Sequence, residues 1–232
     1  MKYLYGNDKI IRKIIALRIL PGKRIKVVRV FPAHLIQIDN TQIAIDKRMA
    51  ESFCNENMRG RHSEIELRDE VVVKRFHSQF RYNFWKELAF LNLLQPFSFV
   101  PRLHGFNKNR LEIEMEYIKG VHIEDAIMDL SPEQLEKILD ACRILDRLSI
   151  QKEEMNHPDR HIIVGDRIVF VDFERGVIRD KPSNLTQFLT YLNHKRRIIP
   201  KDEFISIMKS YKSGFSEKEY QFIKNRVLKE ID

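Results

Sequence analysis

The chain has 232 residues, of which 43% are hydrophobic and 32% charged, and its 41 Lys and Arg against 33 Asp and Glu give a net charge of +8. This composition excludes a disordered or collagen-like chain and allows one compact domain or two small lobes. No stretch approaches the roughly 18 consecutive apolar residues of a membrane span, and charged residues interrupt the start of the chain, unlike a signal peptide. Cys54 and Cys142 have no metal-binding partners nearby in the sequence. We therefore expect a cytoplasmic protein without a zinc site or a disulfide framework.

The excess of positive charge is confined to the first 30 residues. They hold nine basic side chains and one acid, whereas residues 31–232 hold 32 of each sign. Such a segment can present a positive face to a polyanion such as nucleic acid, or it can be a solvated surface with no partner. Charge alone leaves both alternatives open.

Residues 1–54 predict a small N-terminal subdomain that combines a helix with strands. Apolar residues between Ile10 and Leu20 recur at a helical spacing, and Pro21 ends the predicted helix. Three β-branched stretches separated by turn residues follow as predicted strands: Ile25–Val30, Leu35–Ile38 and Gln42–Ile45.

A second group of elements is expected in residues 55–120. The pattern predicts two strands, a helix and a third strand: Glu64–Leu67, Glu70–Phe76, Tyr82–Leu94 and Leu111–Tyr117. We expect a turn at Gly105 and the end of the last strand at Gly120.

A lysine on the second of these strands and a glutamate on the helix suit phosphoryl transfer. Lys74 could neutralise nucleotide phosphates, and Glu87 could hold this lysine as an ion pair. Gly60 and Ser63 lie where a loop over the phosphates is expected, although a loop with one glycine is a weak signal. A surface lysine and a solvated helix glutamate are the ordinary alternatives.

The next segment has the layout of a kinase catalytic loop. Ser131 and Gln134 form a capping box that opens a long amphipathic helix. A polar loop over residues 151–161 leads into two short strands joined by a tight turn, and Asp172 follows directly, in the order Asp-Phe-Glu. A polar loop, a hairpin and an Asp-Phe pair are typical of a kinase and its metal-binding aspartate. Further helices are predicted at Asn184–Leu192, Lys201–Tyr211 and Ser216–Ile231.

Over about residues 55–180 the chain resembles the archaeal RNA kinase family and, more distantly, small RIO-type kinases. Glu154, Pro158 and His161 match a Glu-Leu-x-x-Pro-x-x-His catalytic loop, and Val171-Asp172-Phe173-Glu174 matches an Asp-Phe-Glu metal motif. The resemblance implies an α+β, two-lobed protein-kinase-like fold with an extra N-terminal α/β subdomain. The implied parts are the subdomain, the N-lobe and the C-lobe, at residues 1–54, 55–120 and 121–232.

The resemblance also implies a reaction, in which the γ-phosphoryl group of ATP moves to a ribose 2′-hydroxyl of a uridine in the tRNA variable loop. Glu154 would accept the proton of the hydroxyl, Asp172 would bind Mg²⁺, and His161 would replace the usual asparagine ligand. The catalytic set would be Glu154, Asp172 and Lys74, and the nucleotide would contact Gly60, Ser63, Lys74, Glu87, and Glu116 and Ile118 of a hinge. GTP is an alternative donor.

Two departures leave alternatives open. Glu153 precedes Glu154 where family members often have glycine, so Glu153 could share or take the role of the base. Because Mg²⁺ prefers oxygen ligands, His161 could instead contact phosphate or position the loop.

The acceptor is expected to be tRNA or another folded RNA. Only ten residues separate Asp172 from Ser183, which leaves out the peptide platform of conventional protein kinases. Basic residues that could contact RNA phosphates are Lys23, Arg24, Lys26, Arg75, Arg81, Lys195, Arg196 and Arg197. The alternatives are a small atypical Ser/Thr protein kinase and an inactive nucleic-acid-binding pseudokinase. No obligate protein partner is indicated.

Overall fold

The computed structural model describes residues 12–13, 15–17, 25–29, 34–38, 41–45, 57–59 and 62–230. The chain combines helices and strands, as expected, and divides into two compact units, Met1–Leu67 and Arg68–Asp232. None of the helices described is long and apolar enough to cross a membrane. The predicted boundaries at residues 54 and 120 stay predictions.

The first unit contains the predicted β-branched strands. They form an antiparallel sheet in the order β1 (Ile25–Arg29), β2 (His34–Ile38) and β3 (Thr41–Ile45). Buried side chains alternate along these strands, at Ile36, Ile38 and Ile45, as expected when one face of a sheet is covered. Of the predicted first helix, residues 12–13 and 15–16 are described, and they are helical. Further along the chain, β4 (Asn57–Arg59) pairs antiparallel with β5 (Ser63–Arg68).

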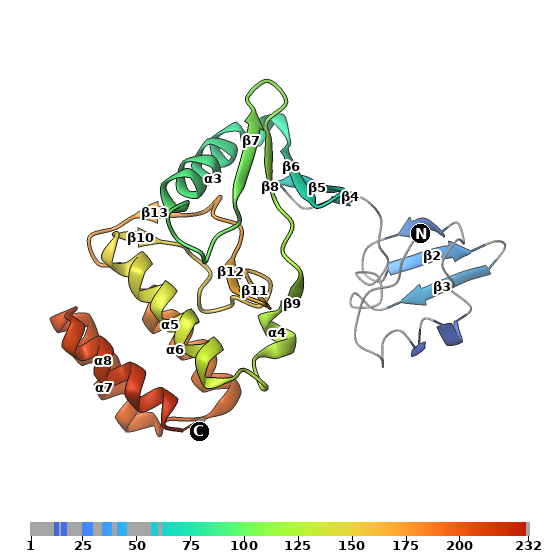
Figure 1. Ribbon diagram of the computed structural model, residues 1–232. Helices are drawn as coiled ribbons and strands as arrows, with labels where there is room; N and C mark the ends of the chain where they lie inside the picture. The colour runs from blue at the N-terminus through green and yellow to red at the C-terminus, as the bar shows by residue number, and fades with distance from the viewer. Residues whose placement is uncertain are drawn as a thin grey trace. The chain divides into compact units, whose positions relative to one another are not determined.

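The second unit begins with an antiparallel group of strands and one helix. β8 (Glu112–Glu116) pairs with β6 (Val71–Phe76) on one side and with β7 (Leu103–Asn107) on the other. After a short 3₁₀ turn, η1 (Ser78–Phe80), the helix α3 (Arg81–Leu94) contacts β6 and β8. Its buried residues Phe84, Leu88 and Leu91 recur at helical spacing, which gives α3 one face against the strands (Figure 1).

The predicted turn at Gly105 was wrong. Gly105 lies inside β7, where the pairing with β8 shifts register between Leu103 and Gly105. A glycine inside a strand often marks such an irregularity, so the residue type indicated a local break that is not a turn.

The predicted strand end at Gly120 was also wrong, because Gly120 begins a new strand, β9 (Gly120–His122). β9 joins β11 (Ile162–Gly165) and β12 (Ile168–Phe170) in a sheet of order β12-β11-β9. A Cβ atom at Gly120 would lie 2.6 Å from the carbonyl oxygen of Val164. The close approach of two backbones, which the local sequence does not reveal, therefore explains this glycine.

Two short strands close the polar loop. β10 (Ile150–Gln151) pairs antiparallel with β13 (Val177–Ile178), so the start of the loop lies beside the segment that follows Asp-Phe-Glu. This pairing joins residues 26 and 28 positions apart in the sequence.

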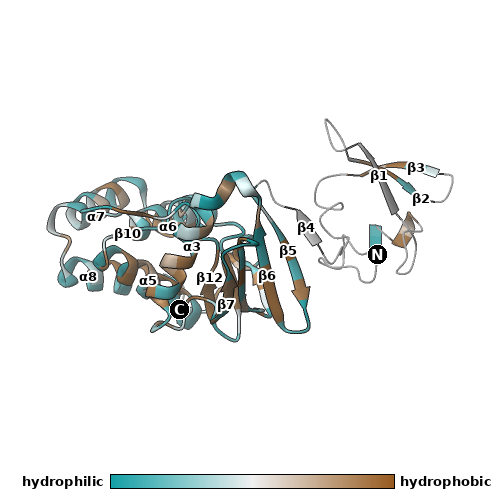
Figure 2. Cartoon of the chain, turned by 90° about the horizontal axis from the view of Figure 1, so that it is seen from above, coloured by the Kyte–Doolittle hydropathy of each residue, from teal (hydrophilic) through white to brown (hydrophobic). Residues whose placement is uncertain are grey.

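Helices make up the other end of this unit (Figure 1). They are α4 (Ile123–Ala126), α5 (Pro132–Arg147), α6 (Asn184–Arg196), α7 (Lys201–Gly214) and α8 (Glu217–Leu228). The capping box of Ser131 and Gln134 is present, and Ser216 and Glu219 form a second one. Brown and teal stretches alternate along α5 in Figure 2, as expected of an amphipathic helix.

A buried polar cluster ties three of these helices together. The carboxylate of Asp146 in α5 accepts hydrogen bonds from the backbone N and the Nδ2 of Asn184, at 2.9 and 2.8 Å. Its other oxygen accepts from the backbone N of Leu185 and the hydroxyl of Tyr211, at 3.3 and 3.0 Å. Asp146 therefore joins α5 to the start of α6 and to α7.

Candidate active site

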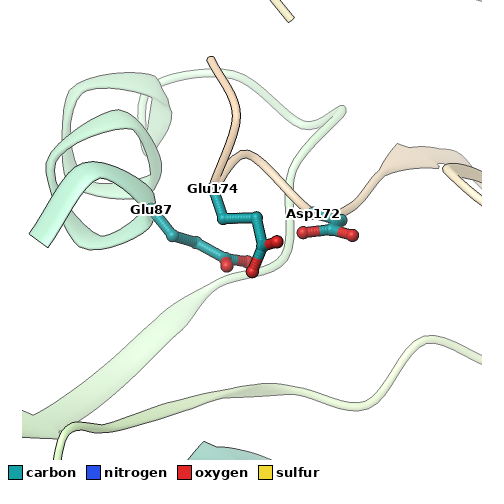
Figure 3. Close-up of side chains that lie close together, drawn as sticks. All are labelled: Glu87, Asp172 and Glu174. Carbon is teal, nitrogen blue, oxygen red and sulfur yellow. The ribbon is translucent and has the colours of Figure 1, made fainter. Parts of the chain in front are cut away.

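Lys74 is the centre of a buried ion cluster. Its ammonium nitrogen lies 2.6 Å from Oε2 of Glu87, 3.0 Å from Oδ1 of Asp172 and 3.6 Å from Oε2 of Glu174. Strand β6 supplies the lysine, α3 supplies Glu87, and the segment after β12 supplies the other two acids. Figure 3 shows the three carboxylates turned toward one another. The structure thus brings the predicted lysine and glutamate together, and it adds Glu174, which sequence reasoning gave no role.

The three carboxylates could hold a cation, since one oxygen from each lies within 4.8 Å of the others. The ammonium of Lys74 already provides positive charge there. Burial raises the pKa of Glu87 to about 7, although Lys74 opposes this. Burial would also raise the pKa of Asp172, but the ammonium groups of Lys74 and Lys152 outweigh it and lower that pKa to about 2. Asp172 is therefore ionised at neutral pH.

Asp172 is held in an unusual backbone conformation with its carboxylate partly open to solvent. Its φ angle is 66°, in the left-handed region that costs a residue with a side chain about 1–3 kcal/mol, and its side chain is 37% exposed. Such backbone strain occurs where the surrounding structure fixes a functional group. Here Oδ1 faces Lys74, which leaves Oδ2 for another partner.

Lys152 stabilises this backbone conformation of Asp172 through a hydrogen bond to its carbonyl oxygen. Its ammonium nitrogen donates to the backbone carbonyl of Asp172 at 3.1 Å and lies 5.1 Å from the centre of the Phe173 ring. The side chain is buried, and this burial lowers the pKa of Lys152 to about 8 even though nearby carboxylates oppose the shift. Sequence reasoning gave Lys152 no role, because a lysine in a polar loop is ordinarily exposed.

His161 lies between Glu154 and Asp172. Its Nε2 is 3.3 Å from Oε2 of Glu154, and its Nδ1 is 3.7 Å from Oδ2 of Asp172. Nδ1 is buried and has no hydrogen-bond partner among the described residues. Burial, followed by the charge of Lys152, lowers the pKa of His161, so the ring is neutral at pH 7. A neutral imidazole can offer one ring nitrogen as an acceptor or a metal ligand.

The two consecutive glutamates of the loop face different partners. Both have a φ angle of 60°, a left-handed pair that turns the chain sharply. Glu154 pairs with Arg175 and faces His161, whereas Glu153 pairs with Arg179 at 2.8 Å. This arrangement favours Glu154 over Glu153 as the carboxylate that acts beside Asp172.

The donor set fits a divalent cation on the open side of Asp172. Oδ2 of Asp172 and Nδ1 of His161 are too far apart for a hydrogen bond, and one ion bound to both could span their separation. A buried ring nitrogen without a partner is uncommon in native proteins and is explained when a ligand fills the gap.

The other residues predicted to contact the nucleotide do not take part in the ion cluster around Lys74. Ser63 is buried in β5, and Gly60 lies outside the described residues. Glu116 ends β8, where its carboxylate accepts from the backbone N of Arg102 at 3.0 Å and pairs with Arg167. Ile118 is half-buried just after this strand.

Some of the basic residues predicted to contact RNA have other partners. Arg196 donates to the backbone carbonyls of Ile127 and Leu130, at 2.6 and 3.2 Å, and so holds the segment after α4. Arg75 bonds to Glu112, with its Nε at 2.7 Å. These pairings link residues distant in the sequence, so local charge could not reveal them.

The remaining basic residues are exposed or undescribed. Arg81, Lys195 and Arg197 are exposed, and the ammonium of Lys195 lies 5.4 Å from the centre of the Tyr191 ring. Lys23 and Arg24 lie outside the described residues, and Lys26 is described by its backbone in β1 alone.

Comparison with known proteins gives a family match within the first unit and a structural likeness over most of the chain. A family model described as the FeoA domain matches residues 3–52. Among solved structures, the chain is similar to a crystal structure of monomeric WbdD, with a TM-score of 0.55 and 14% identity, covering 88% of this chain and 55% of that chain. The chain thus spans about half the length of WbdD, and at this identity the likeness concerns the fold alone. A comparison with curated proteins finds no match.

The expected membership in the archaeal RNA kinase family was wrong. The family model that matches is the FeoA domain, and the structural likeness is to WbdD. The motifs behind the expectation were Glu154 with Pro158 and His161, and Asp172 with its two neighbours. A match at so few positions does not establish a family, because the same residue types are needed wherever the same chemistry occurs.

Proposed function

We propose that the second unit is a two-lobed, kinase-like phosphotransferase that moves the γ-phosphoryl group of ATP to an alcohol. The observation that carries this proposal is the buried ammonium of Lys74 between Glu87 and Asp172, at 2.6 and 3.0 Å. Kinases need a lysine on a strand, a glutamate on the following helix and a metal-binding aspartate after a hairpin.

The arrangement of elements supports the same reading. Strands β6, β7 and β8 with α3 lie at one end of the unit, the helices from α5 onward lie at the other, and β11 and β12 lie between them (Figure 1). Glu87 comes from the first end and Asp172 from the middle, so the cluster is where two lobes would hold a nucleotide. The likeness to WbdD is consistent with this architecture.

Each residue then has a chemical task. Lys74 neutralises phosphate charge, and Glu87 and Glu174 keep its ammonium in place. A divalent cation held by Asp172 and His161 would neutralise charge that develops on the phosphates. Glu154 orients the acceptor hydroxyl and takes its proton while the hydroxyl oxygen bonds to the γ-phosphorus. The bond from that phosphorus to the bridging oxygen breaks, and ADP leaves with the electron pair.

An RNA acceptor stays a prediction. It rests on the positive charge of residues 1–30, which fall largely within the FeoA domain match, and on the exposed Arg81, Lys195 and Arg197. Phosphate transfer to protein would favour an atypical protein kinase instead.

Transfer of label from γ-labelled ATP tests the proposal. The full chain, as wild type and as Asp172→Asn, is incubated with γ-labelled ATP and a divalent metal. Separate reactions contain total RNA, a protein mixture or small polyols as the acceptor. Asp166→Asn is the matched control, because Asp166 is an exposed aspartate in the turn of the same hairpin. We expect metal-dependent transfer that Asp172→Asn abolishes and Asp166→Asn retains. Equal transfer by all three proteins, or none by wild type to any acceptor, would refute the assignment.

A further inference from the structure

We infer that the cation site beside Asp172 selects Mn²⁺ over Mg²⁺, because His161 gives it a nitrogen ligand. The inference rests on the proposed function, since the ion is the one that would accompany the nucleotide. It concerns which ion the site prefers, and it can fail while the proposed function holds.

The two oxygens of Asp172 have different surroundings. Oδ1 accepts from Lys74 at 3.0 Å, and Oδ2 faces Nδ1 of His161 at 3.7 Å. An ion therefore has room on the histidine side of the carboxylate. The other side, where Glu87 and Glu174 lie, already holds an ammonium that would repel a cation.

The orientation of the imidazole makes Nδ1 available to a metal. Nε2 lies 3.3 Å from Oε2 of Glu154, so a proton on Nε2 faces a carboxylate and the lone pair of Nδ1 faces Asp172. Nδ1 is buried and has no partner among the residues that the structure describes. A metal-binding histidine commonly directs its second nitrogen to a carboxylate, which fixes the tautomer and raises the basicity of the ligand. Glu154 is placed for that role.

The ligand types decide between the two ions. Mg²⁺ takes oxygen donors in a strict octahedral geometry and gives up its waters reluctantly. Mn²⁺ also accepts carboxylate and phosphate oxygens. Because it is a larger and softer ion than Mg²⁺, it binds imidazole nitrogen more readily. A site with one carboxylate, one imidazole and nucleotide phosphates therefore suits Mn²⁺ better.

Pulsed electron paramagnetic resonance can detect the nitrogen ligand directly. The full chain is loaded with Mn²⁺ and a non-hydrolysable ATP analogue, and the ¹⁴N coupling to Mn²⁺ is recorded for wild type, His161→Asn and His157→Asn. His157 is an exposed histidine of the same loop and serves as the matched control. We expect the coupling in wild type and His157→Asn and its loss in His161→Asn. The ratio of Mn²⁺ to Mg²⁺ affinity should fall about tenfold or more in His161→Asn.

The outcomes separate this inference from the proposed function. Binding of Mn²⁺ with the analogue but without ¹⁴N coupling, and with an unchanged affinity ratio in His161→Asn, would overturn the inference alone. Failure of the wild type to bind the metal–nucleotide complex would overturn the proposed function. If His161→Asn does not fold, wild type labelled with ¹⁵N-histidine gives the same test, because a ¹⁵N signal must replace the ¹⁴N coupling.

Discussion

Asp146 and Asp172 are two acids in one unit of the chain, and their surroundings differ in a way that separates a structural role from a functional one. Asp146 is 1% exposed, and both of its oxygens accept hydrogen bonds from donors of the protein, including Asn184 and Tyr211. Asp172 has one oxygen on Lys74, and its other oxygen faces a ring nitrogen that lacks a hydrogen bond.

The difference shows where the protein retains capacity for a ligand. A buried carboxylate whose acceptor sites are filled rigidifies the helices that supply its donors. A partly exposed carboxylate on a left-handed residue, with one oxygen unused, gives up stability and leaves a place for an ion. The two aspartates should therefore respond in opposite ways to substitution.

The largest expected effect is on catalysis at Asp172. Asp172→Asn should lower the rate of the proposed phosphoryl transfer about 10³-fold or more, equivalent to about 4 kcal/mol of transition-state stabilisation, because the proposed metal ligand is lost. Its free energy of unfolding should fall by no more than about 2 kcal/mol, because the charge of Asp172 beside Lys74 and Lys152 is lost while Lys74 keeps Glu87 as a partner. Initial rates and urea unfolding of the same preparation check both parts. A loss of stability large enough to explain the loss of activity would mean that Asp172 has a structural role and not a functional one.

The next effect is on stability at Asp146. Asp146→Ala should lower the free energy of unfolding by about 3 kcal/mol, because the buried donors of Asn184 and Tyr211 lose their acceptor. The transfer rate per folded molecule should stay within about twofold of wild type. Urea unfolding followed by circular dichroism measures the first quantity. Unchanged stability would mean that this cluster does not hold α5, α6 and α7 together.

A third effect appears as a dependence of stability on pH. Lys152 has a pKa of about 8 in the folded protein and 10.5 in the unfolded chain. The unfolded chain therefore binds more protons than the folded protein between these two pH values. Stability should therefore rise with pH from about 8 to 10.5, by no more than about 3 kcal/mol. The slope should be smaller in Lys152→Met, measured by urea unfolding across that range. Identical slopes would show that burial of Lys152 is not linked to its protonation.

The smallest effect distinguishes two arginines. Arg175→Gln should lower the transfer rate about tenfold, because Arg175 contacts Glu154, whereas Arg179→Gln should change it less than about twofold. Both are exposed ion pairs, so neither variant should lose more than about 1 kcal/mol of stability. Steady-state rates compare them, and equal effects would show that the pairing of Glu154 has no special consequence.

Much of the fold could be predicted from periodicity, and the predictions that were wrong have a common cause. The strand around Lys74, the helix around Glu87 and the capping box at Ser131 depend on neighbours in the sequence, where local rules apply. The predictions at Gly105 and Gly120 were wrong because the structure around each glycine depends on pairing with another strand.

The candidate site could be predicted only in part for the same reason. Residue types suggested Lys74, Glu87 and Asp172, and the structure brings them together. The burial of Lys152 against a carbonyl 20 positions away depends on the folded loop. So does the divergence of Glu153 from Glu154, which a pair of left-handed residues produces.

The central claim, that Glu154 acts on an acceptor hydroxyl beside Asp172, is tested most directly by comparing Glu154→Gln with Glu153→Gln. The two residues are adjacent, share a φ angle of 60° and each pair with an arginine, so they are a matched pair. The measurement is phosphoryl transfer at saturating ATP, with nucleotide affinity determined by calorimetry. We predict a rate loss of about 10²-fold or more for Glu154→Gln, with unchanged affinity for the metal-free nucleotide, and near wild-type transfer for Glu153→Gln. Full activity of Glu154→Gln would contradict the account.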